Sequence, residues 1–284
     1  MRKNIFVKKK FLVLISIILI LIVFVLGRSF IGKINTRTND ALKDKTTSVK
    51  NELTVETRCT RNARLENEPK FDRALSLVYE KVRQGEEHRS VWTSYNYFPA
   101  QLVNCIKVDT KNVKAEIEAE GYFDINNNDI KPDYFPITID AVTYEYSDDL
   151  TTALLLVHEI THVQQYINYS SIDPEYKYKS LFDPKNKATC FNNEVAAFYA
   201  QLLFFNQLND EEKKSLNLRI QNDKELHPQL KMLQTLQKSL NAQIIDDCDV
   251  YNYQCIMRKI NWKIQMVLEE SGSYDEQCGL IKQI

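Results

Sequence analysis

Five consecutive residues in the middle of the chain carry its strongest chemical signal, and they read His158-Glu159-Ile160-Thr161-His162. In a helix, His158 and His162 lie one turn apart on the same face. Two imidazole nitrogens at this spacing can bind one Zn²⁺ ion. The neighbouring Glu159 can then accept a proton from a water that the metal activates. The pattern therefore predicts a zinc site with a general base beside it.

A catalytic zinc site needs a third protein ligand and an open position for water. The extended motif of metzincins would require Gly and His where this chain has Gln165 and Asn168, so that class is excluded. The two other histidines, His88 and His227, stand in no recognisable motif. The third ligand is therefore expected to be a carboxylate further along the chain.

Glu194 is the best candidate for this carboxylate. It belongs to the segment Asn193–Gln201, whose alanines would let a second helix approach the first one closely. Ala197 and Gln201 would share the face of Glu194, at positions i+3 and i+7. The sequence thus predicts that Glu194 projects toward the histidine pair from a second helix.

His158-Glu159-x-x-His162, followed by Glu194 with alanines two and three positions later, resembles the gluzincin branch of zinc metallopeptidases. It also looks like small bacterial domains with the same motif and unassigned substrates. The resemblance covers roughly residues 70–205. It implies that the two histidines and Glu194 hold Zn²⁺, that Glu159 is the base, and that an edge strand binds the substrate backbone. The best edge-strand candidate is Phe135–Tyr146.

The segments around the motif predict an α+β, zincin-like fold in a domain covering residues 69–284. A helix is expected from Pro69 to just before Gly85, with its apolar residues spaced by three and four. The motif itself should lie on a largely buried helix, Asp149–Ile167. Three neighbouring residues can cap the start of that helix, namely Ser147, Asp148 and Asp149.

Three extended segments between these helices predict a small antiparallel or mixed sheet. They are Gln101–Val108, the alternating run Val113–Glu120, and Phe135–Tyr146. The polar segment Asp124–Asp129 resembles a calcium loop but lacks the glycine and the glutamate that an EF-hand requires, so a solvated turn is expected.

The last third of the chain is expected to be helical, with apolar stripes that face the core. Helices should begin at Asp210 and near Pro228, and a third should span Val250–Glu269. Several side chains of this part are conceivable stabilisers of an oxyanion, and no pattern selects among them: Tyr199, His227, Tyr251 and Tyr253.

The N-terminus predicts a membrane anchor. Residues 1–10 are basic, residues 11–27 are almost purely apolar, and residues 28–68 form a polar stalk. The apolar run is short for a spanning helix but long for the core of a signal peptide, and no cleavage site follows it. We expect an uncleaved signal anchor with a cytoplasmic tail, the alternative being secretion after signal cleavage. In both cases the rest of the chain is exported.

Six cysteines follow the apolar segment, and none forms a C-x-x-C pair. An even number of cysteines beyond a membrane segment predicts two or three disulfides in an oxidising compartment. Their pairing is open, and Cys248–Cys255 is the most local possibility.

The net charge of −1 argues against nucleic acid as a partner. The expected function is a membrane-anchored, extracytoplasmic zinc metallopeptidase acting on exported peptides or proteins. One alternative is a non-catalytic surface module, with a structural metal or none, and another is zinc-dependent hydrolysis of a non-peptide amide.

Overall fold

The computed structural model describes residues 59–88, 98–113, 120–123, 132–172, 187–222, 228–240, 253–272 and 278. All of them belong to one unit that begins at Thr57. The predicted tail, anchor and most of the stalk lie outside the described residues, as does the loop Asp124–Asp129. Within the described ranges, no helix combines the length and the apolar composition that a membrane crossing requires.

The fold is of mixed α+β type, mostly helical, with a single three-stranded sheet in the described part of the chain. Its strands are β1 (Ile106–Lys111), β2 (Gly121–Phe123) and β3 (Phe135–Asp140). The strand order is β1-β3-β2, with β1 parallel and β2 antiparallel to β3. The sheet is therefore mixed, and β3 is its central strand.

This order corrects two expectations about the sheet. Phe135–Tyr146 is not an edge strand: β3 ends at Asp140, whose carboxylate accepts a hydrogen bond from the Thr143 amide and starts the short helix α4 (Ala141–Tyr146). The expected strand Gln101–Val108 is a strand only from Ile106, because Ala100–Cys105 forms the 3₁₀ helix η2. Most of the third expected strand, residues 114–119, lies outside the described residues.

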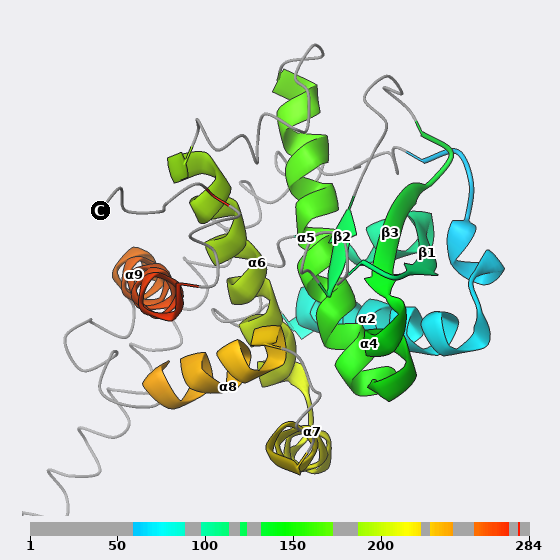
Figure 1. The fold of residues 1–284 in the computed structure, drawn as a ribbon. Helices are drawn as coiled ribbons and strands as arrows, with labels where there is room; N and C mark the ends of the chain where they lie inside the picture. Colours follow the sequence, from blue (N-terminus) through cyan, green and yellow to red (C-terminus); the bar gives the residue numbers. More distant parts are fainter. Residues whose placement is uncertain are drawn as a thin grey trace, which may run out of the picture. The chain divides into compact units, whose positions relative to one another are not determined.

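Three long helices form the core beside the sheet: α2 (Pro69–His88), α5 (Asp149–Ile172) and α6 (Lys187–Gln207). Figure 1 shows α5 between the sheet and α6, with α2 crossing beneath α5. The first helix begins at Pro69 as predicted but continues past Gly85. The side chains of α5 are buried almost all round, as expected for a helix packed on several sides.

The start of α5 is fixed by a reciprocal cap. The Asp148 carboxylate accepts a hydrogen bond from the Thr151 amide at 2.8 Å, and the Thr151 hydroxyl accepts one from the Asp148 amide, also at 2.8 Å. Two backbone donors that a helix start would leave unpaired are thereby satisfied. Of the three predicted capping residues, the structure selects Asp148.

Helices α7 (Asp210–Asn222), α8 (Pro228–Leu240) and α9 (Tyr253–Ser271) follow, with α8 and α9 packed on α6. The predicted starts at Asp210 and Pro228 are confirmed. The apolar stripes of α8 and α9 face the core as predicted, and these side chains are buried: Leu230, Leu233, Leu236, Ile256, Ile260, Ile264 and Val267.

Disulfides join Cys59 to Cys105 and Cys190 to Cys278. Cys255 is also disulfide-bonded, so no described cysteine is free. The most local of the open pairings, Cys248–Cys255, involves Cys248, which lies outside the described residues. The expectation of at least two bridges is confirmed.

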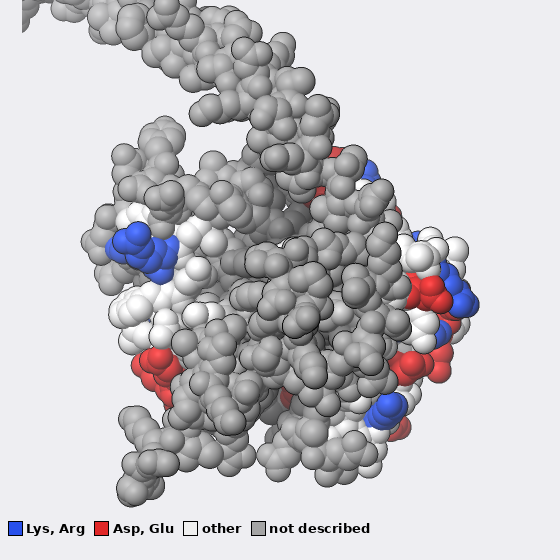
Figure 2. All heavy atoms as spheres, turned by 90° about the horizontal axis from the view of Figure 1, so that it is seen from above, with Lys and Arg blue, Asp and Glu red and all other residues white. Residues whose placement is uncertain are grey.

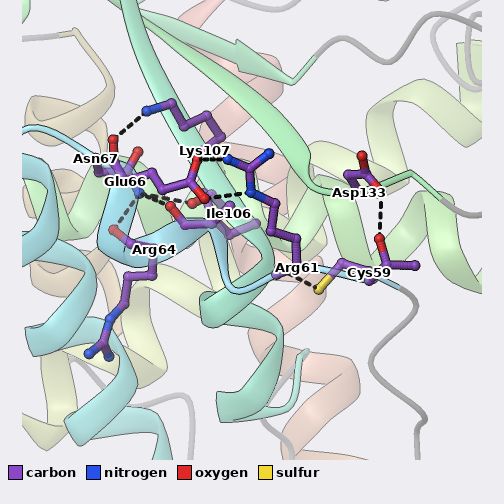
Figure 3. A network of polar contacts seen from close by, with 10 residues as sticks. Cys59, Arg61, Arg64, Glu66, Asn67, Ile106, Lys107 and Asp133 are labelled. Atoms are coloured by element: carbon purple, nitrogen blue, oxygen red, sulfur yellow. Dashed lines mark hydrogen bonds and ion pairs between the residues drawn. The ribbon is translucent and has the colours of Figure 1, made fainter.

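The folded unit begins before Pro69, in a segment that the sequence pattern assigns to the stalk. Here the short 3₁₀ helix η1 (Ala63–Glu66) docks against β1. The Asn67 amide donates to the Ile106 carbonyl at 2.9 Å and accepts from the Val108 amide at 2.7 Å, so it covers the outer edge of β1. Figure 3 shows this η1–β1 network, which includes Arg61, Glu66, Asn67 and Lys107.

The surface charges of the described residues are mixed in sign. On the face drawn in Figure 2, the described acidic and basic side chains lie in small neighbouring groups. Pairs of opposite charge also occur among the described surface residues, for example Arg61–Glu66 and Arg83–Glu87.

Candidate metal centre

The structure brings His158 and His162 of α5 together with Glu194 of α6 in the interior of the molecule. One ligand atom from each residue lies within 4.8 Å of the other two. Nε2 of His158 is 3.1 Å from one carboxylate oxygen of Glu194, and Nε2 of His162 is 3.6 Å from the other. These three residues are called the metal group below.

Helix packing explains how residues far apart in the sequence meet at this point. His158 and His162 share a face of α5 because they are four residues apart, and their ring centroids are 4.9 Å apart. The small side chain of Ala197 is fully buried on α6, one turn after Glu194, and permits a close approach of the two helices. Phe198 packs edge-on against the His158 ring at 5.0 Å and closes the group on one side.

The burial of the metal group is nearly complete. The exposed fractions are 3% for His158, 4% for His162 and 1% for Glu194. An unpaired buried carboxylate is strongly disfavoured, so Glu194 requires positive charge nearby. Without a metal, this charge comes from protonation of one imidazole.

The pKa values of the two histidines diverge accordingly. Burial opposes protonation of His158, but the hydrogen bond and the charge of Glu194 outweigh it, so that its pKa is raised. Burial dominates at His162 and lowers its pKa to about 4, despite the attraction of Glu194. One imidazole is therefore disposed to carry a proton beside Glu194, while the other stays neutral.

This arrangement fits a divalent metal ion well. Zinc bonds of roughly 2.0–2.2 Å to imidazole and carboxylate place neighbouring ligands of a tetrahedron roughly 3.3–3.6 Å apart. The observed separations of 3.1 and 3.6 Å lie close to this range. The donor set of two imidazoles and one carboxylate suits zinc and several other transition metals, and the geometry alone does not distinguish them.

Glu159 lies next to the metal group but is not part of it. Its side chain is 6% exposed, and burial raises its pKa to about 7, opposed mainly by the attraction of His158. A hydrogen bond from the backbone of Phe123, in β2, favours its ionised form. Glu159 is thus a buried carboxyl group that titrates near neutral pH, between the metal group and the sheet.

Gly121 permits the close approach of β2 to this carboxyl group. A Cβ atom at this position would lie 2.9 Å from the Ile139 side chain and 3.2 Å from the Thr138 carbonyl oxygen. It would also lie 3.6 Å from Cγ of Glu159. A larger residue at this position would require the end of the Ile139 side chain to move and the Thr138 carbonyl to shift by a few tenths of an ångström, so glycine gives β2 its closest fit beside Glu159.

A chain of two hydrogen bonds through Gln165 connects the His162 imidazole to α6. Its Nδ1 pairs with Oε1 of Gln165 at 2.8 Å, and Nε2 of Gln165 donates to the Asn193 carbonyl of α6 at 3.0 Å. Gln201 of α6 is fully buried and donates to the Leu154 carbonyl of α5 at 2.9 Å. These contacts join the two helices at the level of the metal group.

All four predicted site residues meet in the structure: Glu159, His158, His162 and Glu194. The sequence interpretation used Gln165 only to exclude metzincins and did not identify Gly121 or Phe123 as neighbours of the site. Gln165 stands three residues after His162, and this spacing on a helix predicts that the two side chains are neighbours.

The other candidates are not brought to the metal group by any described contact. Tyr199 donates its hydroxyl to the Met257 sulfur at 2.6 Å, which places that hydroxyl against α9. His227 and Tyr251 lie outside the described residues, and the side chains of His88 and Tyr253 are likewise not described.

Comparisons with known proteins add no name to this site: no family model matches the chain, and neither a curated protein nor a solved structure is significantly similar to it.

Proposed function

We propose that this protein is a zinc metallopeptidase of gluzincin type, with His158, His162 and Glu194 as the zinc ligands. The observation that carries the proposal is the position of Glu159. It is a buried carboxyl group that stands beside three convergent ligands. A purely structural zinc site is normally closed by four protein ligands and has no need of such a group.

In the proposed reaction, Glu159 first accepts a proton and then donates it. When bound, Zn²⁺ would polarise the peptide carbonyl and acidify the attacking water. Glu159 would take a proton from this water and pass it to the leaving amine. The charge of the bound metal would keep Glu159 ionised at the start of the cycle, when it has to accept a proton.

The substrate backbone would lie along β2 (Gly121–Phe123). β3 is the central strand, and the outer edge of β1 is covered by Asn67, so β2 is the remaining edge of the described sheet. β2 also packs against α5, where Glu159 lies. Strand addition at β2 would therefore bring a peptide bond next to the general base.

The protein would act outside the cytosol, on exported peptides or proteins, and remain attached to the membrane. The disulfides Cys59–Cys105 and Cys190–Cys278 favour an oxidising compartment. The basic and then apolar N-terminus favours an uncleaved anchor. Degradation of the domain by a protease added to intact cells would support this location, and full protection would contradict it.

The test is the substitution Glu159→Gln in the full-length protein. We expect Zn²⁺ binding to remain within a few-fold of wild type while peptide hydrolysis falls at least about 100-fold, as expected for loss of a general base. Hydrolysis of a mixed peptide library is followed by mass spectrometry. The matched control is Glu80→Gln, at an exposed position of α2.

Two results would contradict the proposal. Unchanged proteolysis by Glu159→Gln would exclude Glu159 as the base. Zinc binding without any peptide cleavage by the wild-type protein would favour the non-catalytic alternative.

A further inference from the structure

Two glutamines connect the helices of the metal group in a reciprocal way. Gln165 belongs to α5 and donates its amide hydrogen to the Asn193 carbonyl of α6. Gln201 belongs to α6 and donates to the Leu154 carbonyl of α5. Each glutamine therefore binds the backbone of the opposite helix, and each does so beside one of the two histidines.

The Asn193 carbonyl determines which way the Gln165 amide faces. A backbone carbonyl only accepts hydrogen bonds, so the NH₂ group of Gln165 must point to Asn193 and its oxygen to His162. That oxygen also only accepts, so the proton of the neutral His162 ring must lie on Nδ1. Its Nε2 then presents a lone pair toward Glu194, which is the form a metal ligand requires.

The same logic applies to Gln201 and His158. Because the Leu154 carbonyl takes the amide hydrogen of Gln201, the oxygen of Gln201 is left for another donor. This oxygen and Nδ1 of His158 are both buried, and the structure gives neither of them a hydrogen-bond partner. Leu154 lies one turn before His158 on α5, so the Gln201 amide reaches α5 on the side of that histidine. One atom is an acceptor and the other can carry a proton, so the two are chemically complementary.

We propose that Gln165 and Gln201 are positioning residues that set the protonated nitrogen of His162 and His158 and thereby prepare both Nε2 atoms for one metal ion. Each glutamine is held by a backbone carbonyl of the opposite helix and in turn orients one histidine. The geometry of the metal site therefore depends on how α5 packs against α6. This inference rests on the proposed metal site.

Gln165 and Gln201 differ in charge from the carboxylates that often orient metal-binding histidines. Both are neutral amides, whereas a carboxylate in the same place would add negative charge and make the imidazole a stronger donor. With Glu194 as the only charged ligand, the group carries a single negative charge toward a divalent ion. Gln165 and Gln201 therefore orient the histidines without reducing the positive charge that the metal retains.

The test compares two substitutions at each position, with Zn²⁺ alone as the probe. Gln165→Leu removes both hydrogen bonds, whereas Gln165→Glu keeps an acceptor for His162 and loses the donor to Asn193. We expect Gln165→Leu to weaken Zn²⁺ binding about 10- to 100-fold and Gln165→Glu to stay within about threefold of wild type. Gln201→Leu and Gln201→Glu should behave in the same way. Affinity is measured by competition with a chromophoric chelator.

A matched control is available on the same helix. Gln164 binds Asn168 of α5 and takes no part in the contacts of the metal group. Gln164→Leu should leave the Zn²⁺ affinity unchanged. Circular dichroism of all variants establishes that α5 and α6 are folded before the affinities are compared.

A second readout reports the histidines directly. The chain has only four histidines, so long-range ¹H–¹⁵N spectra of the zinc-loaded protein are simple to assign. We expect Nδ1 of His158 and His162 to carry the proton in the wild type. In Gln165→Leu, the Nδ1 proton of His162 should exchange faster with water, and that of His158 should not.

The outcomes separate three cases. If the Leu and Glu substitutions weaken Zn²⁺ binding equally, the glutamines only hold the helices together and the inference is wrong. If neither substitution changes the affinity, the inference is also wrong, while the proposed function stands. If the wild-type protein binds no Zn²⁺, the proposed function fails first and the inference falls with it.

Discussion

In the η1–β1 network, Arg61 and Glu66 neutralise each other at the protein surface, with 53% and 38% of their side chains exposed. In the metal group, two imidazoles and a carboxylate face one another in the interior, with almost no exposure. Both clusters join segments that are distant in the sequence. They differ in one respect. In the η1–β1 network, protein groups neutralise the charges and fill the hydrogen bonds, whereas in the metal group they do not.

The η1–β1 network is complete without any further group. Asn67 uses both amide hydrogens and its oxygen on backbone groups of η1 and β1, and Lys107 binds the Glu66 carbonyl. Exposed ion pairs of this kind contribute little to stability, because water and salt screen their charges. The network therefore closes the edge of β1 and has no role in the proposed chemistry.

Without a metal, the metal group depends on a proton on one imidazole to offset the charge of Glu194. Burying a charged carboxylate costs several kcal/mol in effective terms, and only a well-placed partner offsets this cost. Buried ionisable groups with perturbed pKa values are typical of functional sites. The comparison teaches that the balanced cluster serves stability and that the unbalanced one serves binding.

The largest expected effect is the loss of metal binding in Glu194→Gln. Removing the only charged ligand should weaken Zn²⁺ binding by at least about 100-fold, more than the loss of an outer-shell contact. Glu66→Gln, in the η1–β1 network, should leave the affinity unchanged. Competition titration and elemental analysis of both variants measure the effect. Wild-type affinity in Glu194→Gln would remove Glu194 from the ligand set.

Each of the two clusters lies beside a disulfide. Cys59–Cys105 lies beside η1 and β1, whereas Cys190 lies one turn before Glu194 on α6. Replacing either pair by alanine should lower the free energy of unfolding by about 2–5 kcal/mol. Only the loss of Cys190–Cys278 should also weaken Zn²⁺ binding, since it loosens the helix that carries Glu194.

Urea unfolding and chelator competition are measured on both double variants. Equal loss of Zn²⁺ affinity in the two would show that global stability, and not the anchoring of α6, controls the metal group.

A smaller effect is expected from pH in the metal-free protein. The pKa of Glu159 is about 7 in the folded state and 4.5 is its ordinary value, so the folded protein binds the extra proton between these limits. As the pH rises through this window, wild type should lose stability relative to Glu159→Gln, by an amount on the order of a few kcal/mol.

Thermal unfolding of both proteins between pH 4.5 and pH 8 measures this difference. The contribution of His162 is common to both and cancels. Saturating Zn²⁺ should reduce the difference, because the cation lowers the pKa of Glu159. Parallel curves without metal would contradict the assigned pKa.

Local signals predicted the helices well. Pro69, Asp210 and Pro228 start helices as expected, because a helix start depends on dihedral preferences and hydrogen bonds within one turn. The strands were predicted less well. The apolar run after Gln101 begins as a 3₁₀ helix, and the run from Phe135 ends at the Asp140 helix cap. The alternation of apolar residues does not reveal where such a local helix replaces a strand.

The pairing of His158 and His162, with Glu159 beside them, follows from the sequence, because residues four positions apart on a helix lie on the same face. The sequence also pointed to Glu194, but only by residue type and spacing. Tertiary structure decided the rest. The packing of α5 on α6 places Glu194 within 3.1 Å of an imidazole 36 residues away, and brings Gln165 and Gln201 to the opposite helices. Such contacts depend on the relative rotation and register of two helices, which the residues of neither helix specify alone.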